Sequence, residues 1–367
     1  MRPRGFGGVL LGTAPSLVAQ CETVADVQAA VGYAVEHELG DSLRLDLRRM
    51  NSVQLDLDAR IVRVGGGATW RDLDRAAQPF CMLTPGGRDS SGAVADTALA
   101  GSSGWLERKL GLAAEALISV ELVTASGELV IADETRNTEL FWALHGGGAN
   151  FGVASALTFR LTQVPITTVA VLTWPATAAP TVIRTYRDLI DAGAPPALGG
   201  GVLLVTGLVM AIVVYVGDCD EARTAIGPLL ALSPEVTVLR ETPYASLQPT
   251  LGLGGWKACS ERYFPAFPDA EVLALCDAAA GMDAGARLAL WPRGRAGDRP
   301  VVYREATWVV EASGAYLEDT CVPAGQERLV EEYGAANYDR LARVKCQYDP
   351  ENVFRVSRNV EPAWRCS

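Results

Sequence analysis

The stretch VVYREATWVVEAS, residues 301–313, carries the side chains best suited to acid–base chemistry. Its alternation is typical of a strand, with Tyr303, Glu305, Thr307 and Glu311 on one face and Arg304, Ala306 and Trp308 on the other. We single out Glu305, because burial would raise the pKa of its carboxyl group into the range useful to a general acid or base. The alternative is an ordinary solvated strand face.

Other kinds of catalytic site find little support in the sequence. The only histidines are His37 and His145, and none of the eight cysteines forms a Cys-x-x-Cys pair, so a zinc site of the usual spacing is not expected. There is no phosphate-binding G-x-x-x-x-G-K-[ST] motif and no G-x-S-x-G motif. We therefore predict no metal, and we interpret His145 as a turn residue.

A glycine-rich stretch, TPGGRDSSGAVADTALAGSSGWLERKLGL, covers residues 84–112. Such loops let the backbone approach a phosphate or a flat cofactor. Here, however, side chains occupy positions where a cradle would prefer glycine, namely Asp96, Thr97, Ala98, Ala100, Ser102 and Ser103. Two further clusters, RVGGGATW and HGGGANFG, do not satisfy G-x-G-x-x-G, and each taken alone is typical of a tight turn.

The composition limits the partners. The chain has 367 residues, 49% of them hydrophobic, and a net charge of −11 at pH 7. The negative charge argues against nucleic acid and anionic membranes as partners. The uncharged run 198–216 fits two buried strands joined at Thr206-Gly207 better than a membrane helix. The arginine-containing N-terminus fits a strand, PSLVAQC, before a helix better than a signal peptide, and the dispersed cysteines favour the cytoplasm.

The order of elements predicts an α+β protein with two lobes. Residues 43–65 are expected to form strand, turn and strand, and residues 117–134 a hairpin turning at Ser126-Gly127. Beyond residue 166, Val- and Leu-rich strands alternate with amphipathic helices. A further helix is expected to end at Asp349-Pro350. We place the boundary near Val164–Pro165, so that 1–165 and 330–367 form one lobe and 166–329 the other.

Several phrases, taken in order, resemble the berberine bridge enzyme-like FAD-linked oxidases, which share the vanillyl-alcohol-oxidase or PCMH-type FAD-binding fold. They span nearly the whole chain: DLRRMNSV, ARIVRVGGGATWRDLDRA, TPGG, GWLERKLGL, VELVTASGELV, ELFWALHGGGANFGVASALTFRL and NYDRLARVKCQYDPENVFRVSRNVEP. The resemblance implies an FAD-binding lobe built from both chain ends and a substrate lobe with an antiparallel sheet backed by helices.

The resemblance also implies roles for individual residues. The part of the substrate sheet at 301–313 would face the substrate and lend acid, base or aromatic groups, which makes Glu305, Tyr303 and Trp308 the candidate catalytic residues. The positions that match family residues near FAD, if flavin is bound, are Gly86, Gly87, Gly104, Phe151, Gly152, Val153 and Asn359. Without flavin, these residues would serve folding alone.

The chain departs from the family at the flavin site. The family carries an Arg-Gly-Gly-Gly-His type loop that holds the FAD pyrophosphate, whereas here the sequence passes from EHELG directly to DSLRLDL. No cysteine lies in the 84–112 stretch to anchor the flavin. Losing about three hydrogen bonds to a charged group would cost on the order of 5 kcal/mol. If the loop at 96–103 now fills cofactor space, Leu99 should be buried and Ala98 and Ala100 should lie close to other backbone.

These departures lead to a first hypothesis of a flavin-independent enzyme with no cofactor. It would cyclise or rearrange, possibly pericyclically, a large apolar secondary metabolite such as a polyketide from bacterial antibiotic biosynthesis, and would gain rate by holding a flexible chain in a reactive shape. The alternative is an FAD-dependent oxidase with non-covalent flavin. A second alternative is a non-catalytic protein that binds a metabolite. The oligomeric state is not predictable from these features.

Overall fold

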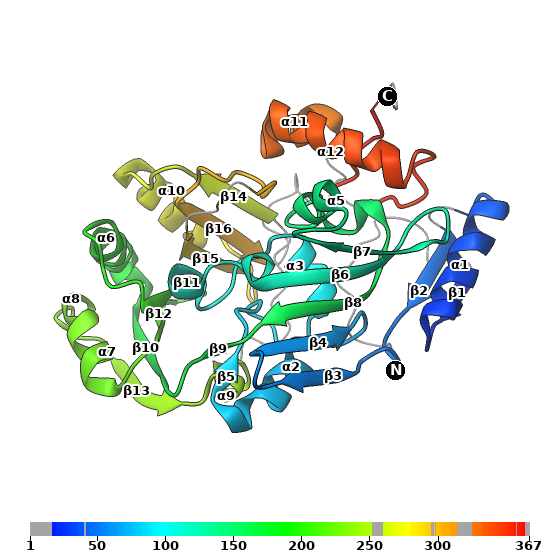
Figure 1. Cartoon of the computed structure of the whole chain (residues 1–367). Coiled ribbons are helices and arrows are strands. Elements are labelled where there is room, and N and C mark those ends of the chain that lie inside the picture. The colour runs from blue at the N-terminus through cyan, green and yellow to red at the C-terminus, as the bar shows by residue number, and fades with distance from the viewer. Residues whose placement is uncertain are drawn as a thin grey trace.

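The computed structural model describes residues 17–39, 42–251, 260–294, 297, 299–313, 325–356 and 358–363, with the side chains of 248–250 excepted. Two large antiparallel sheets flanked by helices make up this part of the chain (Figure 1). The predicted α+β class with antiparallel sheets is thereby confirmed. The lobe boundaries stay a prediction, and below the first lobe means residues 1–165 with 330–367 and the second lobe means residues 166–329.

The first lobe contains a short parallel pair and a five-stranded sheet. The parallel pair is β1 (Leu17–Gln20) and β2 (Leu43–Asp46). The sheet has the order β3 (Val53–Asp56), β4 (Ile61–Gly65), β8 (Val153–Arg160), β6 (Leu117–Val123) and β7 (Leu129–Asp133). The short strands β5 (Met82–Leu83) and β9 (Thr162–Gln163) pair separately. The hairpin between β6 and β7 turns as predicted, with Gly127 at φ +78°.

Helices cover the sheet of the first lobe. They are α1 (Val24–Glu36), α2 (Trp70–Ala77), η2 (Gln78–Phe80), α3 (Val94–Leu99), α4 (Glu107–Leu110), η3 (Ala113–Ala116), α5 (Thr138–Ala143) and η4 (Gly148–Phe151). Helices α1 and α2 each begin with a capping box, in which Thr23 pairs with Asp26 and Thr69 with Asp72. These caps fix where each helix begins.

The second lobe is a seven-stranded antiparallel sheet. Its order is β13 (Val236–Thr242), β10 (Thr167–Pro175), β12 (Leu208–Tyr215), β11 (Leu198–Val205), β15 (Arg287–Pro292), β16 (Trp308–Ser313) and β14 (Ser260–Phe264). The uncharged run 198–216 forms β11 and β12, joined at Gly207 as predicted. No helix within the described residues is long and apolar enough to cross a membrane.

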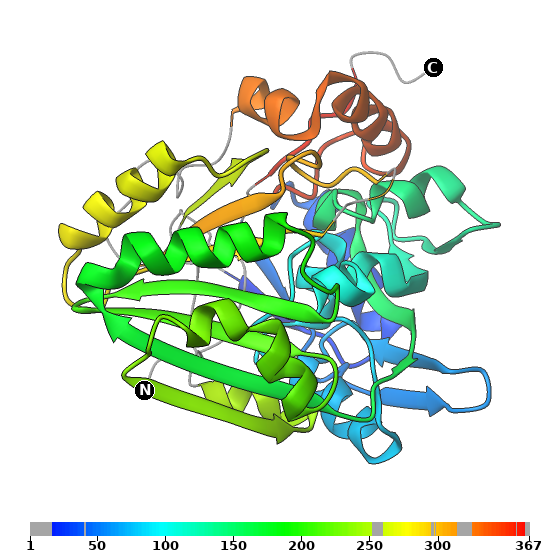
Figure 2. The same cartoon turned by 90° about the vertical axis from the view of Figure 1, so that its left-hand side faces the viewer.

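One face of this sheet is backed by helices. Figure 2 shows α6 (Ala179–Asp191) and α10 (Asp269–Ala280) lying across it. The remaining helical segments of this lobe are η5 (Ala176–Ala178), α7 (Cys219–Ala225), α8 (Gly227–Leu230) and α9 (Tyr244–Leu251). Apolar side chains from the helices and the sheet form one buried cluster, which includes Trp174, Tyr186 and Trp308. The opposite face packs on the first lobe through Trp105, Trp291 and Val309.

The strand predicted over 301–313 begins only at Trp308. Residues 301–307 instead form turns, in which Tyr303 has φ +46°. Val301 and Val302 are buried, and the side chain of Val301 packs on Gly101 of the first lobe. The guanidinium group of Arg293 donates to the carbonyls of Val302 and Tyr303, at 3.3 and 2.9 Å. Residues 301–307 are therefore held by packing between the lobes and by these two hydrogen bonds, and not by pairing with a neighbouring strand.

The C-terminal segment returns to the first lobe. The single helix predicted there is two, α11 (Gln326–Tyr333) and α12 (Ala335–Tyr348), separated by Gly334 at φ +77°. Both lie against the first lobe at the top of Figure 1. A fully buried ion pair, Lys345–Asp349 at 2.5 Å, ends this region. The Lys345 ammonium also donates to the carbonyls of Asn150 at 2.7 Å and Phe354 at 2.8 Å.

We expect Lys345→Met to destabilise the protein by about 3–5 kcal/mol, because it leaves the Asp349 carboxylate buried without its counter-ion. Urea unfolding followed by circular dichroism measures the change. The matched control is Lys109→Met, since Lys109 is exposed, and its effect should stay within about 0.5 kcal/mol. Equal unfolding midpoints for Lys345→Met and the wild type would contradict a stabilising role for this ion pair.

Candidate active site between the lobes

The inner face of the seven-stranded sheet carries a buried carboxylate. Alternation along β16 directs Trp308, Val310 and Ala312 into the helix-backed core, whereas Val309 and Glu311 face the first lobe. Glu311 lies opposite Ala289 of β15 and Glu261 of β14. A carboxylate therefore stands on the face of the sheet that the glycine-rich stretch 84–112 covers.

Arg88 comes from that stretch and pairs with Glu311. Its Nη1 donates to Glu311 Oε1 at 2.7 Å, and the two side chains are 14% and 10% exposed. The Arg88 guanidinium lies 4.2 Å from the ring centroid of Trp291. The Trp291 indole N–H donates to Glu311 Oε2 at 2.9 Å. Glu311 thus accepts hydrogen bonds from Arg88 of the first lobe and from Trp291 of the second.

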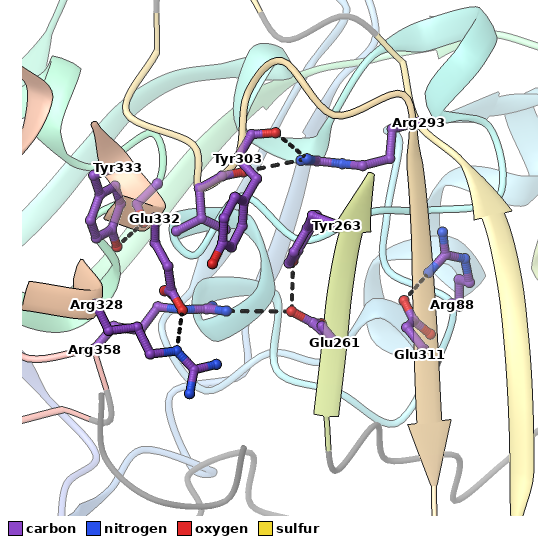
Figure 3. A network of polar contacts seen from close by, with 12 residues as sticks. Arg88, Glu261, Tyr263, Arg293, Tyr303, Glu311, Arg328, Glu332, Tyr333 and Arg358 are labelled. Carbon is purple, nitrogen blue, oxygen red and sulfur yellow. Dashed lines mark hydrogen bonds and ion pairs between the residues drawn. The ribbon is translucent and has the colours of Figure 1, made fainter. Parts of the chain in front are cut away.

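Tyr263 and Glu261 form a second group on β14, next to Glu311 (Figure 3). The Tyr263 hydroxyl donates to Glu261 Oε2 at 2.6 Å. Burial, and then the nearby Glu261 charge, raises the pKa of Tyr263 well above its usual value. The Tyr263 ring stacks on Tyr303 at 4.7 Å between centroids, and the Arg293 guanidinium lies 4.9 Å from the Tyr263 centroid.

The C-terminal segment completes this polar network. Arg358 donates to Glu261 at 3.3 Å and to Glu332 at 3.1 Å. Arg328 also donates to Glu332, at 3.0 Å. The Glu332 backbone carbonyl accepts the Tyr303 N–H at 2.7 Å. Three segments distant in sequence therefore meet around Tyr263, and the arrangement can hold and transfer a proton between a phenol and a carboxylate.

The predicted catalytic residues lie in different surroundings. The Glu305 side chain is 85% exposed and pairs with Arg304 at 3.1 Å, so the burial expected for an acid or base is absent. Trp308 is buried on the helix-backed face beside Tyr186 and Phe267, away from the first lobe. Only Tyr303 joins the network. The difference arises because residues 301–307 are turns, which breaks the alternation that the prediction used.

The sequence prediction missed Arg88, Glu261 and Tyr263 as site residues and gave Glu311 no role. A signal existed for three of these four residues. Glu311 is the single charge in WVVEAS, and Glu261 precedes Tyr263 by two residues in SERYF, which places them on one face of a strand. Nothing local in the sequence connects Arg88 with Glu311, which are 223 residues apart.

The glycines expected near FAD have packing reasons of their own. A Cβ on Gly86 would lie 2.7 Å from the Trp70 ring, and one on Gly104 would lie 2.0 Å from the Gly86 carbonyl oxygen. A Cβ on Gly152 would lie 2.4 Å from the Val123 carbonyl oxygen. Gly87 and Gly104 form a bridge that closes the 84–112 stretch on itself. The contacts at Gly86, Gly104 and Gly152 require glycine whether or not a cofactor binds, whereas a Cβ on Gly87 would come no closer than 3.5 Å to its neighbours.

Two buried polar atoms beside the loop 146–152 fit a bound polar ligand. Asn359 Oδ1 and His145 Nε2 have no hydrogen-bond partner among the described residues. His145 precedes Gly146, and Asn359 precedes Val360, whose N–H donates to Asn150 Oδ1 at 2.9 Å. Burial lowers the pKa of His145 to about 4, so its ring is neutral at pH 7 and Nε2 is an acceptor when Nδ1–H donates to Phe141 O, at 2.6 Å. An FAD cofactor, which carries hydrogen-bond donors and acceptors, would satisfy both atoms.

The loop at 96–103 packs inward as expected in part. Leu99 is 3% exposed and Ala98 is fully buried in α3, whereas Ala100 is only partly buried. Thr97 accepts the Trp70 indole N–H at 2.6 Å. The point between helix 24–36 and strand 43–46 where the phosphate-binding loop is missing falls at 40–41, outside the described residues.

Comparisons with known proteins bear directly on the cofactor. Residues 38–133 match the family described as FAD binding domain, and residues 323–361 match the family described as berberine and berberine like. The (R)-6-hydroxynicotine oxidase of Paenarthrobacter nicotinovorans is 27% identical, covering 95% of this chain and 91% of its own length. An FAD-linked oxidoreductase of Aspergillus ruber is 26% identical, covering 86% and 76%.

Solved structures share the fold. The Physcomitrella patens BBE-like 1 protein superposes with a TM-score of 0.83 at 18% identity, covering 95% of this chain and 92% of that one. The 6-hydroxy-D-nicotine oxidase of Arthrobacter nicotinovorans gives a TM-score of 0.80 at 24% identity, covering 94% and 92%. At these identities the likeness establishes the fold alone.

The first hypothesis, a flavin-independent cyclase without a cofactor, is therefore wrong. The match to an FAD binding domain and the relatives named as oxidases and FAD-linked oxidoreductases support the alternative of an FAD-dependent oxidase. One missing loop and a few filled glycine positions are not enough to exclude FAD. A cofactor as large as FAD makes contacts along much of its lobe.

We expect the variant with glycine at Ala98, Ala100, Ser102 and Ser103 to lose about 2–4 kcal/mol of stability, because each change loosens the unfolded chain and removes packing. None of the four positions has a left-handed backbone that would favour glycine. Thermal and urea unfolding measure the loss. A variant more stable than the wild type would show that the loop is strained.

We expect the folded state to lose up to about 3 kcal/mol through His145 as the pH falls from 6.5 to 4. The pKa of His145 is about 4 in the folded state and near 6.5 when unfolded, so the unfolded chain binds the extra proton in this window. His145→Asn can keep the hydrogen bond to Phe141 without titrating. Its urea midpoint should change less with pH than that of the wild type, and parallel pH profiles would contradict the assignment.

Proposed function

We propose that this chain, which belongs to the berberine bridge enzyme-like FAD-linked oxidase family, is an FAD-dependent oxidoreductase that oxidises a small molecule at the interlobe face of its seven-stranded sheet. The observation that carries the proposal is the FAD binding domain match over 38–133. That segment includes Arg88, which contacts Glu311 of the other lobe. The segment that matches an FAD binding domain therefore contacts the polar face of the seven-stranded sheet.

The residues proposed to contact FAD remain Gly86, Gly87, Gly104, Phe151, Gly152, Val153 and Asn359, and His145 joins them. The Asn359 amide oxygen and His145 Nε2 would accept hydrogen bonds from the cofactor. FAD, when bound, supplies an acceptor for the hydride that a substrate carbon loses.

Tyr263 and Glu261 are proposed to take the proton that an alcohol or amine loses during oxidation. The Tyr263 hydroxyl passes its proton to Glu261 while Tyr263 Oη receives the substrate proton. The raised pKa of Tyr263 disfavours a free phenolate, so both transfers are expected to occur together, with the proton residing on Glu261. Arg358 donates to Glu261 Oε2 at 3.3 Å and so holds this carboxylate beside the Tyr263 hydroxyl.

The substrate is proposed to be predominantly apolar. The same face of the sheet continues to the edge strand opposite β14, where Val236 and Val238 of β13 are 49% and 41% exposed. Val171 and Met210, on the neighbouring strands, are partly buried and continue this apolar strip. The relative named for 6-hydroxynicotine makes a ring-containing amine a reasonable first substrate to test.

A cytoplasmic location stays a prediction from the cysteine pattern.

The first test is the flavin content of the purified protein. We expect flavin absorbance and FAD release on denaturation. Adding FAD to protein stripped of flavin should raise the melting temperature saturably, since FAD at one hundred times Kd adds about 2.7 kcal/mol to the free energy of unfolding. Protein that contains no flavin and is not stabilised by FAD would overturn the proposal. Flavin binding without peroxide release from any amine or alcohol would favour the non-catalytic alternative.

The second test is the proton transfer. Tyr263→Phe and Glu261→Gln should each lower kcat by about a hundred- to ten-thousandfold while flavin content stays unchanged. Glu305→Gln should leave kcat near the wild-type value, because that carboxylate is 85% exposed and pairs with its neighbour Arg304. Full activity in Tyr263→Phe would exclude the phenol as a proton acceptor, and a large loss in Glu305→Gln would restore Glu305 as a candidate.

A further inference from the structure

A small cavity separate from the polar network lies where the two lobes meet at their lower edge. It has a volume of about 130 Å³. Its lining comes from α2, η2 and β5 of the first lobe, from the connection at Val164–Pro165, and from the start of α9, and these elements lie together at the bottom of Figure 1. The lining residues include Asp74, Gln78, Leu83, Val164, Pro243 and Tyr244.

Asp74 is the unusual member of this lining. Its side chain is buried, the residue being 5% exposed, and Oδ1 has no hydrogen-bond partner among the described residues. A buried carboxylate without a counter-charge is costly unless it is protonated or a ligand supplies the charge. Burial alone raises the pKa of Asp74 to about 8. Nothing in the proposed oxidation uses this group.

The walls around Asp74 indicate the type of ligand. Leu83 and Val164 are buried apolar residues, and Gln78 and Cys81, on the same lining, are exposed and mark an opening to solvent. No group of three metal-ligating side chains occurs among the described residues, so the donor set does not suit a divalent metal. One carboxylate above apolar walls suits an ammonium head group that carries a short alkyl chain.

We propose that this cavity binds a small primary alkylammonium ion, with its charged nitrogen on Asp74 and its alkyl chain against Leu83 and Val164. The volume exceeds that needed for a single water molecule by about tenfold, which leaves room for a few heavy atoms. Because the cavity is lined from both lobes, the bound ion stabilises their contact. The lining of this site includes none of the residues of the Tyr263 network.

Thermal unfolding with ethylammonium chloride tests the proposal. Tetramethylammonium chloride at equal ionic strength is the control, since it carries the same charge but no N–H donor. We expect a saturable rise in Tm for the wild type with ethylammonium, and none for Asp74→Asn. The Asn side chain is isosteric and neutral, as Asp74 itself is below its pKa. Glu305→Gln, which removes an exposed carboxylate outside the cavity, should respond like the wild type.

The pH dependence gives a second readout. The ammonium ion binds the ionised form of Asp74, so its apparent Kd should tighten about tenfold per pH unit from pH 6 to pH 8 and level off above. Cys81 and Tyr244 are the other titratable groups in the lining. Arg71 and Arg75 of α2, and Glu241 before α9, are exposed. Cys81→Ser should therefore leave the pH profile unchanged.

Should Asp74→Asn fail to fold, Ala245→Leu provides an independent variant, because Ala245 lines the cavity and a larger side chain would fill it. Loss of the ethylammonium effect in that variant supports the site. Three results would overturn the proposal: no saturable shift in the wild type beyond that of tetramethylammonium, an equal shift in Asp74→Asn or Ala245→Leu, or equal stabilisation by potassium ion.

Discussion

The contacts of the buried Lys345 ammonium group fix how the C-terminal segment packs on the first lobe. It has three acceptors, the Asp349 carboxylate and the carbonyls of Asn150 and Phe354, and neither Lys345 nor Asp349 is exposed. Asp349 in turn accepts the N–H groups of Val353 and Phe354 at 2.7 and 2.9 Å. A charge buried at such cost is tolerated only when all of its hydrogen bonds are made. The segment that carries Arg358 and Asn359 is thereby held against the loop 146–152.

The second constraint is the two-sidedness of the seven-stranded sheet. Along β16, one set of side chains enters the helix-backed core and the other set meets the first lobe. The same period of two places Glu261 and Tyr263 of β14 on the inner face with Glu311. Each of these carboxylates has a cationic partner from the first lobe or the C-terminal segment, Arg88 for Glu311 and Arg358 for Glu261. The polar network is therefore assembled by lobe packing and not by one strand.

The cofactor shows how far a local physical argument extends. The missing loop and the filled glycine positions predict loss of FAD, yet the match to an FAD binding domain covers 96 residues, from 38 to 133. The side chains at 96–103 do pack inward, as Ala98 and Leu99 show. That packing is compatible with a retained cofactor, because helix α3 buries these residues in the core of its own lobe. The inward packing of residues 96–103 therefore does not exclude a bound flavin.

The sequence alone determined the α+β class, the strand pair at 198–216, the hairpin at Gly127 and the helix 24–36. These features follow from apolar period, turn residues and caps, which act over a few residues. The order of its motifs also predicted the resemblance to FAD-linked oxidases, which the matches over 38–133 and 323–361 support. Tertiary structure decided that residues 301–307 form turns and not a strand, because Val301 packs on Gly101 and Arg293 donates hydrogen bonds to two backbone carbonyls of this segment. It also decided which carboxylates are buried. Packing of the lobes brings together partners such as Arg88 and Glu311, which are 223 residues apart in the sequence, and no local sequence pattern encodes such a pairing.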